Sequence, residues 1–181
     1  MNKKVFPNWL TAGRGILTLI IIALFFISCP DKYVWILILF IIACLTDFFD
    51  GILARSWKVI SNFGKMFDPL FDKILTISLY FLLMPLFGQW LGLLFILLIL
   101  RELIIDGIKN YMLAKGEVTP AIVSAKIKTS SQMLMLTAAL AYLTWPLSWI
   151  LQLTYTLGIL AVIMAYYSGL IYFKKFLKFY K

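Results

Sequence analysis

The sequence predicts an all-α integral membrane protein with six transmembrane helices, and three observations lead to this fold class. Hydrophobic residues make up 63% of the 181 residues and the mean hydropathy is +0.97, far above what a soluble globular domain shows. The apolar residues gather in six stretches, most of them close to the ~20 residues that a spanning helix needs. Lysine and arginine collect at alternate ends of these stretches, as expected for a chain that crosses a membrane repeatedly.

The chain is expected to begin with a short N-terminal interfacial helix. Phe6, Trp9 and Leu10 recur at helical spacing among basic residues, a pattern typical of a helix that lies at the membrane surface. No small-residue cleavage site follows the first apolar run, so a removable signal peptide is not expected. A disordered basic tail is the alternative.

The six spans follow in order. The first, residues 15–29, is the shortest and starts either there or near Thr11. The connections between spans are too short to hold a second domain, so the sequence predicts a single domain over residues 1–181. The other five spans are expected at residues 33–54, 69–87, 89–113, 121–145 and 149–173.

Charge placement orients the predicted bundle. With both termini inside, Lys32 is the only basic residue at an outer connection, and the other 16 of the 17 lysines and arginines lie in inner segments or inner helix halves. This bias predicts an integral membrane protein with both termini on the cytoplasmic side. The net charge of +9 indicates contact with anionic membrane lipids and no nucleic-acid binding, because the charges flank apolar spans. The last basic residues are Lys174, Lys175, Lys178 and Lys181.

Two residue types narrow the chemistry. Histidine is absent, which excludes every catalytic triad with a histidine base. Cys29 and Cys44 lack the spacing of a metal or redox motif, so both are interpreted as packing residues.

The feature that bears most on function is the spacing D-x2-D-G-x2-A-R-x8-G-x3-D-x3-D inside otherwise apolar sequence. Carboxylates that border a bilayer are costly and therefore indicate a functional site. Chance occurrence of all eight residues is on the order of 10⁻⁹ or less per start point, at about one in twenty for each. The eight are Asp47, Asp50, Gly51, Ala54, Arg55, Gly64, Asp68 and Asp72.

The predicted topology brings the aspartates together near the cytoplasmic surface. Asp47 and Asp50 share one helix face with Gly51, a residue that leaves room for a ligand or another helix. Asp68 and Asp72 are four residues apart on the next helix and also point one way. Ionised aspartates at this density require protonation or intervening cations, and all-oxygen sites suit Mg²⁺ or Mn²⁺, which also bind phosphates. Two such ions would fit phosphoryl or phosphatidyl transfer.

This signature resembles that of the CDP-alcohol phosphatidyltransferase family. The resemblance implies six transmembrane helices, a homodimer, and a cytoplasm-facing active site that binds a CDP-linked lipid through two divalent ions. It assigns Asp47, Asp50, Asp68 and Asp72 to the metals, with Asp72 also as the catalytic base. It places Asp47, Gly51, Ala54 and Arg55 beside the cytidine diphosphate, with Gly64 allowing a close turn of the loop.

The acceptor is indicated by flanking segments that resemble the bacterial phosphatidylglycerophosphate synthase branch of this family. These are Pro7-Asn8-x2-Thr11-x2-Arg14, Arg101-Glu102, and Lys126-x-Lys128-Thr129 with Gln132. On that resemblance the acceptor is sn-glycerol 3-phosphate, and its phosphate would contact Thr11, Arg14, Arg101, Lys109, Lys126 and Lys128.

Physical arguments leave alternative roles open for three of these basic residues. Lys126 and Lys128 are two residues apart and cannot share a helix face, so one would bind the acceptor and the other lipid headgroups. Ordinary positive charge at an inner flank is the alternative for both. Arg101 is expected deep in its span, lining the cavity, with a purely structural ion pair as the alternative.

Three residues depart from the branch pattern. Lys109 stands where an arginine is usual and loses the bidentate fork that fits phosphate. Ala125 replaces a glycine, and Phe71 replaces a small residue before the last aspartate. These changes leave the expected reaction chemistry intact and concern the identity of the acceptor.

The predicted reaction is transfer of a phosphatidyl group from CDP-diacylglycerol to glycerol 3-phosphate, with Asp72 activating the acceptor hydroxyl. Within the family, the alternatives are another acceptor: phosphatidylglycerol, as in a cardiolipin-type synthase, or inositol phosphate. A divalent-cation transporter is the alternative from a different class, since intramembrane aspartates also line ion paths. A non-catalytic membrane scaffold would leave the four aspartates unexplained.

Overall fold

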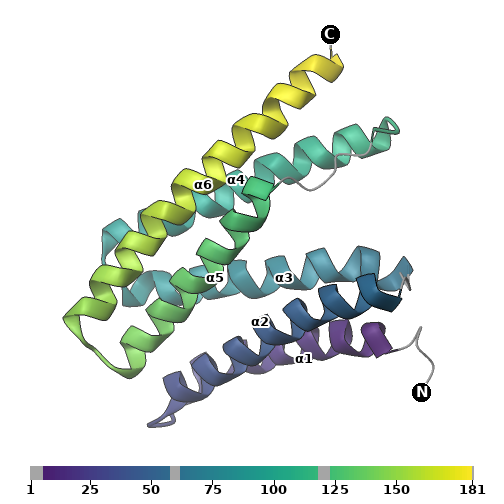
Figure 1. Cartoon of the computed structure of the whole chain (residues 1–181). Helices are drawn as coiled ribbons and strands as arrows, with labels where there is room; N and C mark the ends of the chain where they lie inside the picture. The colour runs from purple at the N-terminus through teal and green to yellow at the C-terminus, as the bar shows by residue number, and fades with distance from the viewer. Residues whose placement is uncertain (1–5, 58–61, 118–122, 181) are drawn as a thin grey trace. The chain divides into compact units, whose positions relative to one another are not determined.

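The computed structural model describes residues 6–57, 62–117 and 123–180, with side chains for 12–47, 70–117 and 123–180. All regular structure in these ranges is helical (Figure 1), so the predicted all-α class is confirmed. The elements are α1 Phe6–Phe26, α2 Lys32–Trp57, α3 Asn62–Leu83, the short 3₁₀ helix η1 Met84–Leu86, α4 Gln89–Ala114, α5 Val123–Thr144 and α6 Ser148–Tyr180.

Each predicted span corresponds to one long helix, but three helices extend at least five residues further than predicted. α1 begins at Phe6, so the expected interfacial helix is not separate and forms the first turns of α1. Pro7 lies in that first turn, where its missing N–H is not needed. α3 begins seven residues before the predicted start at 69, and α6 ends seven residues after the predicted end at 173. Hydropathy marks where a helix is apolar, whereas a helix continues into polar sequence because its hydrogen bonds are internal.

Gly64 corrects one expectation. The resemblance placed it in a loop that needs a close turn, but its backbone lies in the first turn of α3. The residue therefore continues the helix that carries Asp72.

The outside of the helices is apolar. Leu19, Phe26 and Ile163 have exposed fractions of 66%, 77% and 58%, which suits contact with lipid better than contact with water. By length and composition, α6 is the one helix within the described residues that meets the requirements of a membrane span, and the apolar part of α1, Ala12–Phe26, is shorter. These features support association with a membrane, and six spans remain a prediction.

Exposed tryptophans lie next to the helix ends on the predicted outer side. Such residues are typical of membrane–water interfaces because their rings are amphipathic. They are Trp35, Trp90, Trp145 and Trp149.

The described chain divides into two compact units. The first contains residues 1–82 and 140–146, hence α1, α2 and nearly all of α3. α1 packs along α2 (Figure 1), and the core of this unit includes Ile21, Ile36 and Phe40. This unit carries all four aspartates of the signature.

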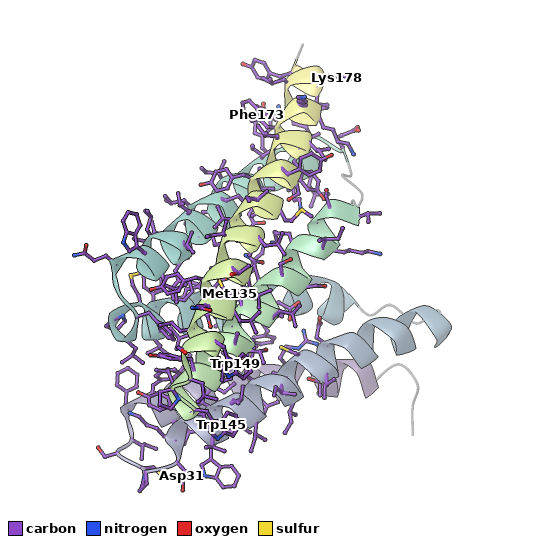
Figure 2. All side chains as sticks on the ribbon, turned by 60° about the vertical axis from the view of Figure 1, so that its left-hand side comes forward. Asp31, Met135, Trp145, Trp149, Phe173 and Lys178 are labelled. Carbon is purple, nitrogen blue, oxygen red and sulfur yellow. The ribbon has the colours of Figure 1, made fainter. Side chains whose placement is uncertain are left out.

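The second unit contains residues 83–139 and 147–181, and α4 packs against α6 within it. Small residues on α6 permit the close approach: a Cβ added to Gly158 would lie 2.9 Å from a methyl carbon of Leu94 and 3.2 Å from the sulfur of Met135. Figure 2 labels Met135 on α5, and shows Trp149 at one end of α6 with Phe173 and Lys178 toward the other. The small residues are Gly158, Ala161, Ala165, Ser168 and Gly169.

Candidate active site

Two aspartates of the signature meet at one arginine in the first unit. The Nη1 atom of Arg14 on α1 lies 3.0 Å from Oδ1 of Asp47 on α2 and 2.6 Å from Oδ1 of Asp72 on α3. The Arg14 side chain is 1% exposed, whereas those of Asp47 and Asp72 are 45% and 34% exposed. The buried cation therefore holds two carboxylates that remain accessible to a ligand.

Local packing places these three side chains. Gly15 has no side chain, and the ring of Phe71 lies 2.8 Å from the position that a Cβ of Gly15 would take. This contact brings α1 against α3 next to Arg14 and Asp72. The large residue at position 71, a departure from the branch pattern, therefore fills the space beside a glycine.

The remaining signature residues were predicted for the metals and the CDP-lipid, and Thr11 for the acceptor. Their backbones lie in α1, α2 and α3, but their side chains lie outside the described residues. Their roles stay predictions. They are Thr11, Asp50, Gly51, Ala54, Arg55, Gly64 and Asp68.

The donor set fits a hard divalent cation. Asp47 and Asp72 offer carboxylate oxygens, the ligands that Mg²⁺ and Mn²⁺ prefer, and their oxygens already converge on one positively charged atom. Among the residues whose side chains are described, there is no cluster of three or more potential metal ligands. These residues include only two of the four predicted aspartate ligands, because Asp50 and Asp68 lie outside them.

A second polar cluster lies within the second unit and centres on Arg101 and Glu102 of α4. Arg101 donates from Nε to the Ala165 carbonyl oxygen at 2.9 Å and from Nη2 to the Ser168 hydroxyl at 2.6 Å. Its Nη1 lies 3.4 Å from Oε2 of Glu102. Arg101 was predicted to line a cavity and to bind phosphate or a carboxylate. The contact with the Glu102 carboxylate agrees with this prediction and equally with the alternative of a structural ion pair, and the binding of phosphate stays a prediction.

Glu102 joins α4 to α5. The Lys128 ammonium donates to its Oε1 atom, and Gln132 Nε2 lies 3.4 Å from the same oxygen. Lys128 and Glu102 are both buried, at 8% and 9% exposed, whereas Lys126 is exposed. The two lysines thus differ in surroundings, as their spacing predicts.

Lys109, another departure from the branch pattern, contacts an aromatic ring. Its Nζ lies 4.2 Å from the ring centroid of Tyr172 on α6, a cation–π distance. Sequence reasoning missed Tyr172, Ala165 and Ser168, because none belongs to a motif. The stripe of small residues on α6 was the signal that could have placed this face against α4.

Comparison with known proteins gives a consistent result. The profile of the CDP-alcohol phosphatidyltransferase family matches residues 4–167. A CDP-diacylglycerol--glycerol-3-phosphate 3-phosphatidyltransferase of Wigglesworthia glossinidia brevipalpis is 31% identical over 177 residues, covering 96% of this chain and 92% of the relative. A protein of the same name from Salmonella choleraesuis is 32% identical over 170 residues, with 92% and 91% covered. The match of the profile to most of the chain, together with the complete signature, shows that the chain belongs to the CDP-alcohol phosphatidyltransferase family.

Proposed function

We propose that this protein transfers a phosphatidyl group from CDP-diacylglycerol to sn-glycerol 3-phosphate, giving phosphatidylglycerol phosphate and CMP. The observation that carries the proposal is the meeting of Asp47 and Asp72 at Arg14, within a complete family signature. The relatives whose names state this reaction match more than nine-tenths of the chain, which supports the choice of acceptor.

Asp72 is the proposed general base. Its carboxylate is partly exposed and accepts the proton of the acceptor's primary hydroxyl. The hydroxyl oxygen forms a bond to the lipid-side phosphorus, while the bond from that phosphorus to the bridging oxygen breaks and CMP leaves. Arg14 donates to Oδ1 of Asp72 and is proposed to hold this carboxylate in place for the proton transfer.

The proposed cofactor is a pair of Mg²⁺ or Mn²⁺ ions held by Asp47, Asp50, Asp68 and Asp72. When bound, such ions neutralise the pyrophosphate and stabilise the departing CMP oxygen. Gly51, Ala54 and Arg55, with Gly64 nearby in the sequence, would border the cytidine diphosphate.

The acceptor phosphate is proposed to contact Lys126 and, on the family resemblance, Thr11, Arg14 and Lys109. Lys126 is exposed, whereas the Lys128 ammonium donates to Glu102. This difference favours Lys126 as the residue that contacts the acceptor phosphate. Arg101 and Lys128 are proposed to fix the positions of α4 and α5, the helices that carry Lys109 and Lys126.

The proposal extends to the setting of the reaction. The whole chain, residues 1–181, would act as one membrane domain of the bacterial cytoplasmic membrane. It would cross the membrane six times, keep both termini and the site cytoplasmic, and assemble as a homodimer.

The test is CMP release by the purified protein from CDP-diacylglycerol with Mg²⁺ or Mn²⁺ and a panel of acceptors. Glycerol 3-phosphate is expected to support release, and inositol phosphate and phosphatidylglycerol are not. Asp72→Asn should abolish release and retain CDP-lipid binding, whereas Asp31→Asn, at an exposed position, should behave as the wild type. CMP release with a different acceptor alone would identify another acceptor substrate and leave the proposed phosphatidyl transfer unchanged. Absence of CMP release with every acceptor, together with metal flux into liposomes, would favour a divalent-cation transporter.

A further inference from the structure

A groove runs between α4 and α6 within the second unit. It holds about 420 Å³ of space, including its open side. Ile104 and Ile105 form one wall, and Gly169 and Leu170 form much of the other. Arg101 also lines it, but its Nε and Nη2 atoms are bonded to α6. The groove therefore offers apolar surface and suits an apolar ligand.

Two residues set the length of the groove. Tyr166 lines one end and donates from its hydroxyl to the Leu97 carbonyl oxygen at 3.4 Å, which ties α6 to α4 there. Phe173 lines the other end. Seven residues separate them on α6, or about 10 Å at 1.5 Å per residue. The groove accepts a narrow, extended apolar segment of that length, and Gly169 leaves it open because it has no side chain.

The Phe173 end lies where α6 becomes basic. α6 has 33 residues, about 50 Å of helix, against ~30 Å for a hydrocarbon core. If Ser148 lies at one membrane surface, the turns after about residue 168 reach the opposite headgroup region. Figure 2 shows Phe173 and Lys178 in this last part of α6, far from Trp149.

Helix geometry places Lys174 next to the groove. Lys174 is exposed and follows Phe173 directly, one step of about 100° around the helix. Lys175 is two such steps away and points to the opposite side. Positive charge next to an apolar groove at headgroup depth complements a lipid with a negatively charged head.

We infer that the α4–α6 groove binds one acyl chain of an anionic phospholipid, whose phosphate contacts Lys174. The chain would enter at Phe173 and run past Leu170 and Gly169 to Tyr166. This site lies within the second unit and uses none of the signature aspartates.

Native mass spectrometry of the full-length protein in detergent tests the inference. The protein is titrated with phosphatidylglycerol or with phosphatidylcholine carrying the same acyl chains, in the absence of CDP-lipid. We expect phosphatidylglycerol to bind at least five-fold more tightly. Equal affinity for the two lipids would overturn the inference.

Variants locate the binding. Gly169→Leu fills the groove and should weaken phosphatidylglycerol binding at least five-fold, whereas Gly107→Leu, at a position with no neighbouring atom within 4 Å and outside the groove, should not. A Cβ added at Gly169 would lie 3.6 Å from a side-chain carbon of Ile105, so a leucine there could prevent folding, and Ile104→Trp at the exposed wall provides a second block. Unchanged binding in a folded blocking variant refutes the groove as the site.

A charge pair completes the test. Lys174→Gln should weaken binding of phosphatidylglycerol and leave that of phosphatidylcholine unchanged, and Lys175→Gln should alter neither. Equal effects of the two substitutions would mean that general positive charge, and no site at Lys174, attracts the lipid.

Discussion

Removing the Glu102 carboxylate should destabilise the protein strongly. Its Oε1 atom is the acceptor for the buried Lys128 ammonium, and its Oε2 atom faces Arg101. Arg101 would retain its bonds to Ala165 and Ser168, so the loss falls on Lys128, a cation 8% exposed. Removing one partner of a buried ion pair costs about 3–5 kcal/mol. We therefore expect Glu102→Met to lower the free energy of unfolding by an amount in that range.

The matched substitutions separate charge from packing. Lys128→Met leaves Glu102 near both Arg101 and Gln132 and should cost less, about 1–3 kcal/mol. The double variant Glu102→Met/Lys128→Met buries no orphaned ammonium. It should be more stable than Glu102→Met alone, because replacing a whole buried pair with apolar residues is often nearly neutral.

The assay is equilibrium unfolding in mixed detergent micelles, followed by circular dichroism at a wavelength sensitive to helix. Glu117→Gln is the control, since this residue is exposed just after α4. A loss below about 1 kcal/mol for Glu102→Met, the value of an ordinary exposed pair, would refute the reasoning. So would a double variant as unstable as the single one.

Three further predictions concern the first unit and the substrates. Gly15→Ala should lower the free energy of unfolding by about 1–3 kcal/mol through its clash with Phe71, and adding Phe71→Ala should recover part of that loss. Gly13→Ala, with nothing within 4 Å, should not destabilise; equal melts for both glycine variants would contradict the packing argument. Lys126→Gln should raise the KM for glycerol 3-phosphate about ten-fold or more, the effect of losing ~1.4 kcal/mol of phosphate binding, and leave the KM for CDP-diacylglycerol unchanged. A change in the KM for CDP-diacylglycerol alone would show that Lys126 does not bind the acceptor. Chelating divalent ions with EDTA should weaken CDP-lipid binding, measured by isothermal titration, at least ten-fold, and unchanged binding would show that the carboxylates act without metal.

The sequence predicted the helices best where apolar stretches end at turn residues. The predicted ends of α4 and α5 lie within a few residues of the observed ones, because Gly88, Gly116 and Pro146 interrupt the pattern there. The starts of α1 and α3 and the end of α6 were missed, since these turns carry polar or basic residues. A hydropathy pattern locates the part of a helix that suits lipid, and the helix itself runs on.

The candidate site was predictable only in part, for a related reason. Two helices that meet at one surface bring Asp47 and Asp72 near each other, which topology alone indicates. The position of Arg14 depends on packing between residues 58 apart in sequence, and the motif had assigned it to the acceptor phosphate. Likewise, no local sequence pattern could predict that Lys128 pairs with Glu102, which lies 26 residues away in sequence.

The place of Arg14 changes the charge argument for the site. Four ionised aspartates with one guanidinium carry a net charge of −3, as counted from the sequence, which disfavours any approach of a pyrophosphate. Two divalent ions would turn this into a net charge of +1 and let the anionic CDP-lipid bind. With a single divalent ion the net charge would still be −1, so Arg14 lowers the requirement for metal without removing it. Binding of metal before CDP-lipid follows from this count, and it is the reason that chelation should weaken substrate binding as well as abolish turnover.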